Sequence, residues 1–256
     1  MRILSLCRSI FLAAVATAVF SCSEKKEDFV AGEPVTEYLP LQTGKYITYR
    51  VDSLVTNDFN IALETHSYQV KHVVDAQVTD NLGRPSYRVY RYRNNVDGTG
   101  PWVSDGSYFI TPLTHQMEVV EDNLRFIKLR EPIKEGFSWK GNTYLPENPY
   151  TPFGYNISVD NSIASWDCTY DLFEPTTVIN GQTYTNVWTV EQIDETKSDP
   201  VAFPDDYANR IRSVEKYARN VGLVYRQLLL WEYETVGSVN PSYLGFGVTM
   251  WMIDHN

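Results

Sequence analysis

Cysteine is scarce in this sequence, and its placement excludes a fold held together by disulfides. The 256 residues include three cysteines, Cys7, Cys22 and Cys168. Cys7 lies in an N-terminal segment, residues 1–21, that we expect to be removed, and Cys22 is the first residue after that segment. A disulfide scaffold needs paired cysteines, so the remaining 235 residues must be stabilised by a hydrophobic core, for which they are long enough.

The sequence also has no apolar run long enough to cross a membrane as a helix. Its N-terminal run, Ile10 to Phe20, is eleven residues long and is interrupted only by Thr17, whereas a bilayer needs about 20 apolar residues. The preceding nine residues contain Arg2 and Arg8 but no acid. A basic start followed by a short apolar run predicts a secretory signal peptide, here residues 1–21.

Positive charge is in deficit. The whole chain carries 22 Lys and Arg against 32 Asp and Glu. Removal of residues 1–21 takes away two Arg and no acid, which gives the mature chain a net charge of −12. Nucleic-acid binding needs a clustered basic surface, so we expect no nucleic-acid partner.

Sequence motifs for metal binding and for catalysis are missing. The four histidines form no HExxH motif, and no CxxC pair occurs. A continuous strand would place His66 and His72 on one face, but roughly 20 Å apart along it, too far to bind one ion. We therefore expect no metal and no cofactor.

The acidic pairs do not point to a catalytic site either. All of them fall in the expected tether or in predicted turns: Glu27-Asp28, Glu121-Asp122, Asp194-Glu195 and Asp205-Asp206. No G-x-S-x-G motif is present. A hydrolase with acids brought together from distant strands stays open as the alternative function, but a non-catalytic protein is favoured.

The N-terminus carries the most specific motif of the chain. Val19-Phe20-Ser21-Cys22 resembles the lipobox of bacterial lipoproteins, which implies cleavage before Cys22 and lipid on Cys22. Ser23 to Asp28 are all polar, and residues 22–34 are expected to form a flexible tether. Stable anchoring needs more than one acyl chain, which lipoprotein processing supplies.

Within the tether, Lys26-Glu27-Asp28 resembles the surface-export signal of Bacteroidota lipoproteins. The resemblance implies a protein anchored in the outer membrane and exposed at the cell surface, with the periplasmic face as the alternative.

The rest of the chain alternates apolar and polar residues with a period of two, which predicts β-strands. The predicted strands cover residues 45–51, 67–74, 86–93, 116–120, 124–129, 177–179, 183–190, 213–218, 223–231 and 247–253. Asn180-Gly181 separates two of them and favours a two-residue type I′ turn. The fold class is therefore all-β, a single antiparallel β domain over residues 35–256.

Two architectures remain possible for this domain: an open, curved sheet or half-barrel, and a β-sandwich. Short helices are expected at Asp58–Glu64 and Asp205–Arg212, and a surface loop at Asn142–Asn161. The segments Pro40–Gly44 and Pro132–Gly136 share the pattern Pro-aliphatic-x-x-Gly, and each is expected to turn into an aromatic strand.

Three segments carry a resemblance to Bacteroidota surface and envelope lipoproteins: Tyr38–Gly44, Val178–Val187 and Tyr217–Tyr225. The resemblance implies a β-rich exported domain. It brings no catalytic residues with it.

Aromatic residues are abundant, with 18 Tyr, 11 Phe and 6 Trp. Packing within a sheet is the first explanation, and a binding surface for a glycan, lipid or protein ligand is the alternative. The candidate contacts are aromatic residues in predicted loops: Trp102 in the Gly-rich loop Asp97–Gly106, and Tyr144, Tyr150, Phe153 and Tyr155. Cys168 lies between Trp166 and Tyr170 and is predicted to be a buried, unpaired thiol.

The sequence thus predicts a lipid-anchored extracytoplasmic lipoprotein that binds an envelope or extracellular ligand, or that serves as an accessory to an envelope complex.

We expect mass spectrometry of the cell-derived protein to find residues 1–21 missing and lipid on Cys22. Cys22→Ser should move the protein from the membrane to the soluble fraction. A Cys22→Ser protein that stays with the membrane would contradict the lipobox assignment.

Overall fold

The structure is a computed structural model that describes residues 32–155, 162–235 and 241–256. The chain divides into two units, Met1–Gly32 and Glu33–Asn256, and the second is described here by itself. The predicted signal peptide, Cys22 and the tether up to residue 31 lie outside the described residues.

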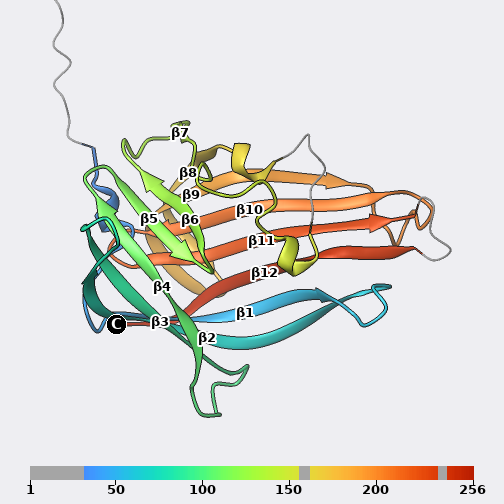
Figure 1. The fold of residues 1–256 in the computed structure, drawn as a ribbon, viewed down its shortest axis with the longest axis horizontal. Coiled ribbons are helices and arrows are strands. Elements are labelled where there is room, and N and C mark those ends of the chain that lie inside the picture. Colours follow the sequence, from blue (N-terminus) through green and yellow to red (C-terminus); the bar gives the residue numbers. More distant parts are fainter. Residues whose placement is uncertain (1–31, 156–161, 236–240) are drawn as a thin grey trace, which may run out of the picture. The chain divides into compact units, whose positions relative to one another are not determined.

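The described residues form one twelve-stranded antiparallel sheet (Figure 1). The strands are β1 (Tyr46–Thr56), β2 (Leu63–Thr79), β3 (Pro85–Asn95), β4 (Val103–Leu113), β5 (Gln116–Glu121), β6 (Leu124–Arg130), β7 (Ser138–Trp139), β8 (Cys168–Ile179), β9 (Gln182–Lys197), β10 (Ala208–Ala218), β11 (Gly222–Glu234) and β12 (Ser242–His255). Each of the predicted strand segments lies in one of them, except that Lys45 falls just before β1. The all-β prediction is confirmed.

The order of the strands brings the two ends of the domain together in the sheet. It runs β6-β5-β4-β3-β2-β1-β12-β11-β10-β9-β8-β7, so β1 pairs with β12 at the centre. The break falls between β6 and β7, and the sheet curls until these edges nearly meet. The Ile127 N–H donates to the Gly141 carbonyl at 2.8 Å, and the Trp139 indole N–H donates to the Ile127 carbonyl at 2.9 Å.

The domain is therefore a single curled sheet, which confirms the prediction of an open, curved sheet or half-barrel. The β-sandwich alternative is wrong, because all twelve strands belong to one sheet. Near-closure also leaves little unpaired edge, which is the part of a sheet most prone to aggregate.

Turn chemistry explains how the strands are joined. Asn180 and Gly181 adopt φ of 48° and 79° between paired residues Ile179 and Gln182. This is the predicted type I′ hairpin, which requires positive φ at both central residues. The β5–β6 hairpin also has a two-residue turn with positive φ at both positions, Asp122 at 51° and Asn123 at 63°.

The two Pro-aliphatic-x-x-Gly segments fold alike. The first precedes strands β1 to β6 along the chain, and the second precedes strands β7 to β12. The Gly44 N–H donates to the Val74 carbonyl on β2, and the Gly136 N–H donates to the Tyr170 carbonyl on β8, both at 2.8 Å. Both glycines have positive φ, 87° and 77°, which a side chain would oppose. The prediction that these segments turn into β1 and β7 is confirmed.

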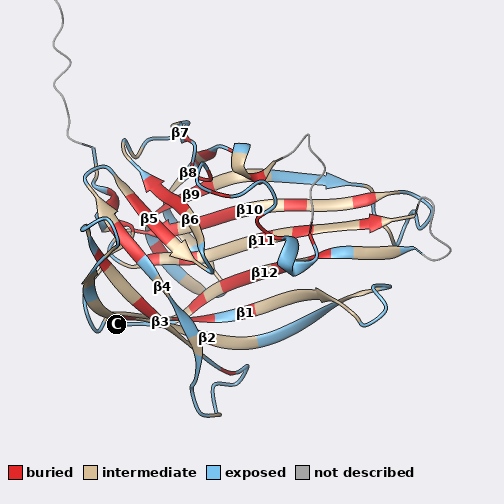
Figure 2. Ribbon diagram, viewed as in Figure 1, coloured by how far each residue is buried: buried red, intermediate tan, exposed pale blue. Residues whose placement is uncertain are grey.

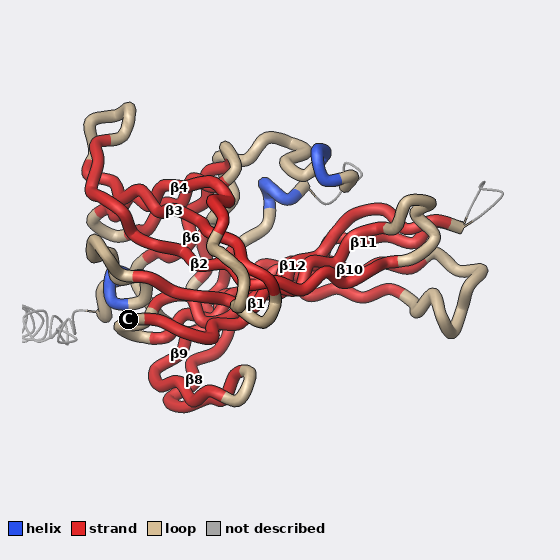
Figure 3. The backbone as a smooth tube through the Cα atoms, turned by 90° about the horizontal axis from the view of Figure 1, so that it is seen from below, coloured by secondary structure: helices blue, strands red, loops and turns tan. Residues whose placement is uncertain are grey.

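The expected helices at Asp58–Glu64 and Asp205–Arg212 are wrong. In the first, the Asn57 side chain accepts hydrogen bonds from the Ile61 and Ala62 N–H groups and closes a turn before β2. In the second, β10 begins at Ala208 and pairs with both neighbours. The helical elements of the described residues are three-residue 3-10 turns: η1 (Val35–Glu37), η2 (Thr151–Phe153) and η4 (Ile163–Ser165) (Figure 3).

Two predicted loops also differ from the structure. The Gly-rich loop ends early, because β4 starts at Val103 and Gly106 lies within the strand with φ of 99°. The segment Asn142–Asn161 is not a plain surface loop in its described part, residues 142–155. Asn142, Tyr150 and Tyr155 are buried there, because the segment packs its aromatic and aliphatic side chains against the sheet.

Buried positions recur along β10, β11 and β12 in the middle of the sheet (Figure 2). Cys168 is buried and unpaired, as predicted, and its thiol packs with Trp139 and Tyr170. Burial raises the pKa of this thiol to about 12, so it is protonated and unreactive at neutral pH. Among the residues that the structure describes, no helix has the length and hydropathy to span a bilayer.

Closure of the sheet depends on the absence of a side chain at position 141. A Cβ added to Gly141 would overlap the Sγ of Cys168 and lie 2.9 Å from the Ile127 carbonyl oxygen. We expect Gly141→Ala to lower the free energy of unfolding by about 1–3 kcal/mol through overpacking, measured by denaturant titration.

Two further variants test this explanation. Adding Cys168→Ala should recover part of the stability lost in Gly141→Ala, since it removes the nearest atom. Gly32→Ala, whose new Cβ would have no neighbour within 4 Å, should be neutral. Equal effects at Gly32 and Gly141 would show that close packing at the β6–β7 edge is not the cause.

Candidate functional site

The concave side of the curled sheet contains a cavity with two lobes. The large lobe has a volume of about 330 Å³ and the small lobe about 80 Å³. Four residues line both lobes and form the waist between them: His72, Glu121, Arg226 and Met250. The large lobe falls at the lower end of the size range of small-molecule sites, roughly 300–1,000 Å³.

Strand alternation explains which side chains reach the cavity. Every second residue of β2 from Tyr68 to Val74 lines it, including His72, because successive side chains of a strand point to opposite faces. On β12 the lining residues Phe246, Val248 and Met250 follow the same rule. The sequence pattern that builds the sheet thus also selects the walls of the cavity.

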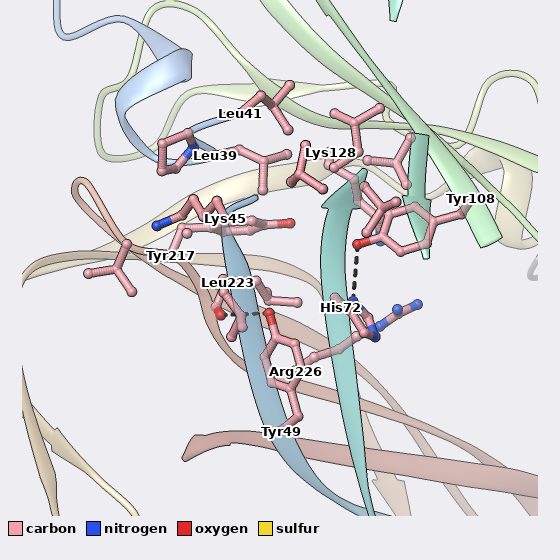
Figure 4. Close-up of a pocket in the computed structure, with 18 of the residues that line it drawn as sticks. Leu39, Leu41, Lys45, Tyr49, His72, Tyr108, Lys128, Tyr217, Leu223 and Arg226 are labelled. Atoms are coloured by element: carbon pink, nitrogen blue, oxygen red, sulfur yellow. Dashed lines mark hydrogen bonds between the residues drawn. The ribbon is translucent and has the colours of Figure 1, made fainter. Parts of the chain in front are cut away.

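Most of the wall is apolar or aromatic. The small lobe is surrounded by aliphatic side chains such as Leu39, Leu41 and Leu223, with His72, Tyr108 and Arg226 at its inner end (Figure 4). Residues at η2 cover part of the large lobe. Tyr150 and Phe153 line that lobe, and both rings contact Phe246, with centroids 5.4 and 5.3 Å apart.

A network of ion pairs is centred on the waist and extends into both lobes, because Arg91 lines the large lobe and Lys128 and Glu215 line the small one. We count these three residues with the waist. The Glu121 carboxylate accepts hydrogen bonds from Arg91 Nη1 at 2.8 Å and from Arg226 Nη1 at 3.2 Å. The Glu215 carboxylate accepts from Lys128 Nζ and from the Tyr217 hydroxyl, each at 2.7 Å. Arg226 Nε lies 3.4 Å from Glu215 Oε1, so Arg226 bridges the two carboxylates.

These contacts keep both carboxylates charged. Burial by itself raises the pKa of Glu121, but the charges of Arg226, of His72 once it is protonated, and of Arg91 outweigh it and hold this pKa at about 2. The pKa of Glu215 is likewise lowered, because Lys128 and Arg226 outweigh the effect of burial. Ion pairs of this kind stabilise the charged form of an acid.

His72 and Tyr108 are neutral neighbours of this network. Burial lowers the pKa of His72 to about 4 and raises the pKa of Tyr108. His72 Nδ1 and the Tyr108 hydroxyl are joined by a 3.0 Å hydrogen bond, and the Tyr49 ring packs edge-on against His72 at 5.1 Å (Figure 4). Both side chains therefore keep one protonation state around neutral pH.

This chemistry suits binding better than catalysis. A glycosidase acid must hold a proton at its working pH, through a raised pKa, whereas Glu121 and Glu215 are ionised and hydrogen-bonded. His72 is a poor general base near pH 7, since an efficient base has a pKa close to the working pH. Within the described ranges, no group of three or more His, Cys, Asp or Glu side chains is placed to hold a metal ion.

The structure separates the five aromatic residues proposed as ligand contacts. Tyr150 and Phe153 line the large lobe, and Tyr155 is buried in the core cluster beside it. Trp102 and Tyr144 line neither lobe; they are 37% and 52% exposed. Each packs beneath a cation, Lys71 over Trp102 at 4.9 Å and Arg125 over Tyr144 at 5.6 Å.

The charged residues of the waist were not predicted from the sequence. Glu121 was expected in a solvated turn with Asp122, but it is the last residue of β5 and lines the cavity. A signal was present at Arg226, which interrupts the largely apolar strand β11, where an unpaired charge would be costly. Its partner Glu121, however, lies 105 residues away along the chain.

Comparison with known proteins adds little to this picture. No protein-family model matches the chain, and no curated protein matches it. One similar solved structure is a protein of Bacteroides fragilis NCTC 9343, provisionally described as an exported protein with a YmcC-like fold. The identity is 11% and the TM-score 0.32, over 85% of this chain and 97% of that one.

The lowered pKa of His72 predicts a pH dependence of stability. An unfolded chain takes up a proton on this side chain near pH 6.5, but the folded protein does so only near pH 4. Stability should therefore fall as the pH is lowered through that window. We expect a loss of about 1–3 kcal/mol in the free energy of unfolding from this residue, measured by denaturant titration between pH 7.5 and 5.

The variant His72→Gln should flatten this dependence. The matched control is His66→Gln on the same strand, because the His66 side chain is 64% exposed. A slope that survives His72→Gln, or one that disappears in His66→Gln, would show that His72 does not control it.

Proposed function

We propose that this chain is a lipid-anchored extracytoplasmic binding protein that holds a small, largely apolar molecule in the cavity of its β domain. The non-catalytic binding role comes from the cavity, and the location from the signal peptide and the lipobox ending at Cys22. The residues Lys26-Glu27-Asp28 support exposure at the surface of the outer membrane, with the periplasmic face as the alternative.

The observation that carries the binding role is the cavity itself. The large lobe has a volume of about 330 Å³, is walled mainly by apolar and aromatic side chains and is open to solvent, with its lining residue Phe153 52% exposed. Concave apolar surface left in contact with water favours a ligand that covers it. Apolar walls with a few polar groups at one place are typical of small-molecule sites.

The hydrolase alternative has less support. A cleft with perturbed pKa values is a usual sign of an active site, and this cavity has such groups. Here, however, the shifts of Glu121 and Glu215 come from ion pairs that keep both carboxylates charged, and structural ion pairs perturb pKa values in the same way.

A plugging variant tests the binding role. Val55 lines the large lobe on β1, so Val55→Trp should fill part of the lobe. We expect the mature chain with Cys22→Ser, kept free of detergent, to enhance the fluorescence of the neutral apolar dye Nile red. Val55→Trp should weaken Nile red binding about tenfold or more, equivalent to about 1.4 kcal/mol.

The control is Val178→Trp, the same substitution at a residue of β8 that is 65% exposed. It should bind Nile red like the parent chain, and both variants should keep the parent's denaturation midpoint within error. Absence of dye binding in the parent chain, or equal binding by Val55→Trp and Val178→Trp, would refute the proposed site.

A further inference from the structure

We propose, building on the binding role above, that the ligand is a single-chain amphiphile with one anionic group, held with its charge at the waist beside Arg226 and its chain along the large lobe.

The charge count at the waist favours an anion. Three cations, Arg91, Arg226 and Lys128, share the two interior carboxylates of Glu121 and Glu215. The neutral imidazole of His72 adds no charge. The waist therefore carries one positive charge more than its interior acids balance, and one anionic group would complete the count.

A third acid, Asp122, lines the large lobe and pairs with Arg91 at its solvent-exposed rim. Asp122 Oδ1 accepts from Arg91 Nη2 at 3.0 Å, but its side chain is 52% exposed at the tip of the β5–β6 hairpin. Water screens such a charge strongly. Asp105 also lines the large lobe, with its side chain 34% exposed and 3.9 Å from Arg93. These two acids disfavour an anionic group at their part of the lobe and leave the waist as its place.

The cations can be reached from the cavity. The side chains of Arg226 and Arg91 each keep 19% of their surface accessible, and both line the large lobe. A carboxylate or similar group could therefore contact a guanidinium without displacing the ion pairs already made, because Arg carries five N–H donors. Hydrogen bonds between charged partners are the strongest in proteins.

The wall beyond the waist suits a hydrocarbon chain. Val51, Val70, Phe126, Leu228 and Val248 line the large lobe from five different strands. These side chains offer no hydrogen bond, so a ligand with polar groups along its length would lose hydration there without compensation. A ligand with no charge would instead displace water from the waist and leave the unpaired positive charge there without a partner. One charge and one chain satisfy both parts of the cavity.

Three ligands with the same chain and different heads test this. Laurate, 1-dodecanol and dodecyltrimethylammonium, all below micelle formation, are titrated against Nile red on the detergent-free mature chain with Cys22→Ser. We expect laurate to displace the dye with an affinity about tenfold higher than 1-dodecanol, and the cation to be the weakest. Equal affinities, or a preference for the cation, would overturn the anionic head and leave the binding role intact. No displacement of bound dye by any of the three would overturn the single-chain amphiphile.

A variant locates the charge. Arg226→Gln should reduce the preference for laurate over 1-dodecanol to about twofold or less, whereas Arg50→Gln, at a side chain 46% exposed, should keep it. An unchanged preference in folded Arg226→Gln would overturn the placement at the waist. If Arg226→Gln fails to fold, the ligand series on the parent chain still decides the charge of the head, and Lys128→Met, on the other side of Glu215, tests the placement.

Discussion

The bridge that Arg226 makes between Glu121 and Glu215 is the interaction on which the interior of this domain depends. It joins β11 to β5 and β10, and Lys128 of β6 completes the network. Strands β5 and β6 lie at one end of the strand order and β10 and β11 towards the other. The ion pairs therefore cross the inside of the curled sheet, where no backbone ladder runs. Removing one member of such a network strands its partner's charge, at a cost of about 3–5 kcal/mol.

The same network explains why the cavity has two lobes and what chemistry it offers. The side chains of His72, Glu121 and Arg226 occupy the space between the apolar walls and so divide the cavity into two lobes, and the charged ones are paired there, as buried charges must be. The charges that separate the lobes also keep Glu121 and Glu215 ionised, which removes them as proton donors. What remains is a fixed polar centre between apolar walls, and this arrangement supports the proposed binding role.

Local patterns predicted most of the sheet, and long-range pairing explains what they missed. Alternation located strands such as β2 and β11, and Asn180-Gly181 located a hairpin, because both signals act over a few residues. Strand β4 was not predicted, because Gly106 made the start of this strand resemble the end of a Gly-rich loop. The site was missed because its charges come together only when the sheet curls: Lys128 and Glu215 are 87 residues apart, and Glu121 and Arg226 are 105 apart. Tyr150 and Phe153 were predicted as ligand contacts because they are aromatic residues in an expected loop. No local sequence pattern, however, showed that they line a cavity and that Trp102 does not.

The central claim is that the waist is a cationic centre facing the cavity. The protonation state of a bound carboxyl group tests this claim most directly. Laurate labelled with ¹³C at its carboxyl carbon, bound to the mature chain and followed by NMR as the pH is lowered, reports that state. If the carboxylate lies beside Arg226, the bound signal should stay at the position of the ionised form to a lower pH than the signal of free laurate, because neighbouring cations lower an acid's pKa. A bound carboxyl that takes up its proton at a higher pH than free laurate would place it in an apolar part of the cavity and contradict the account.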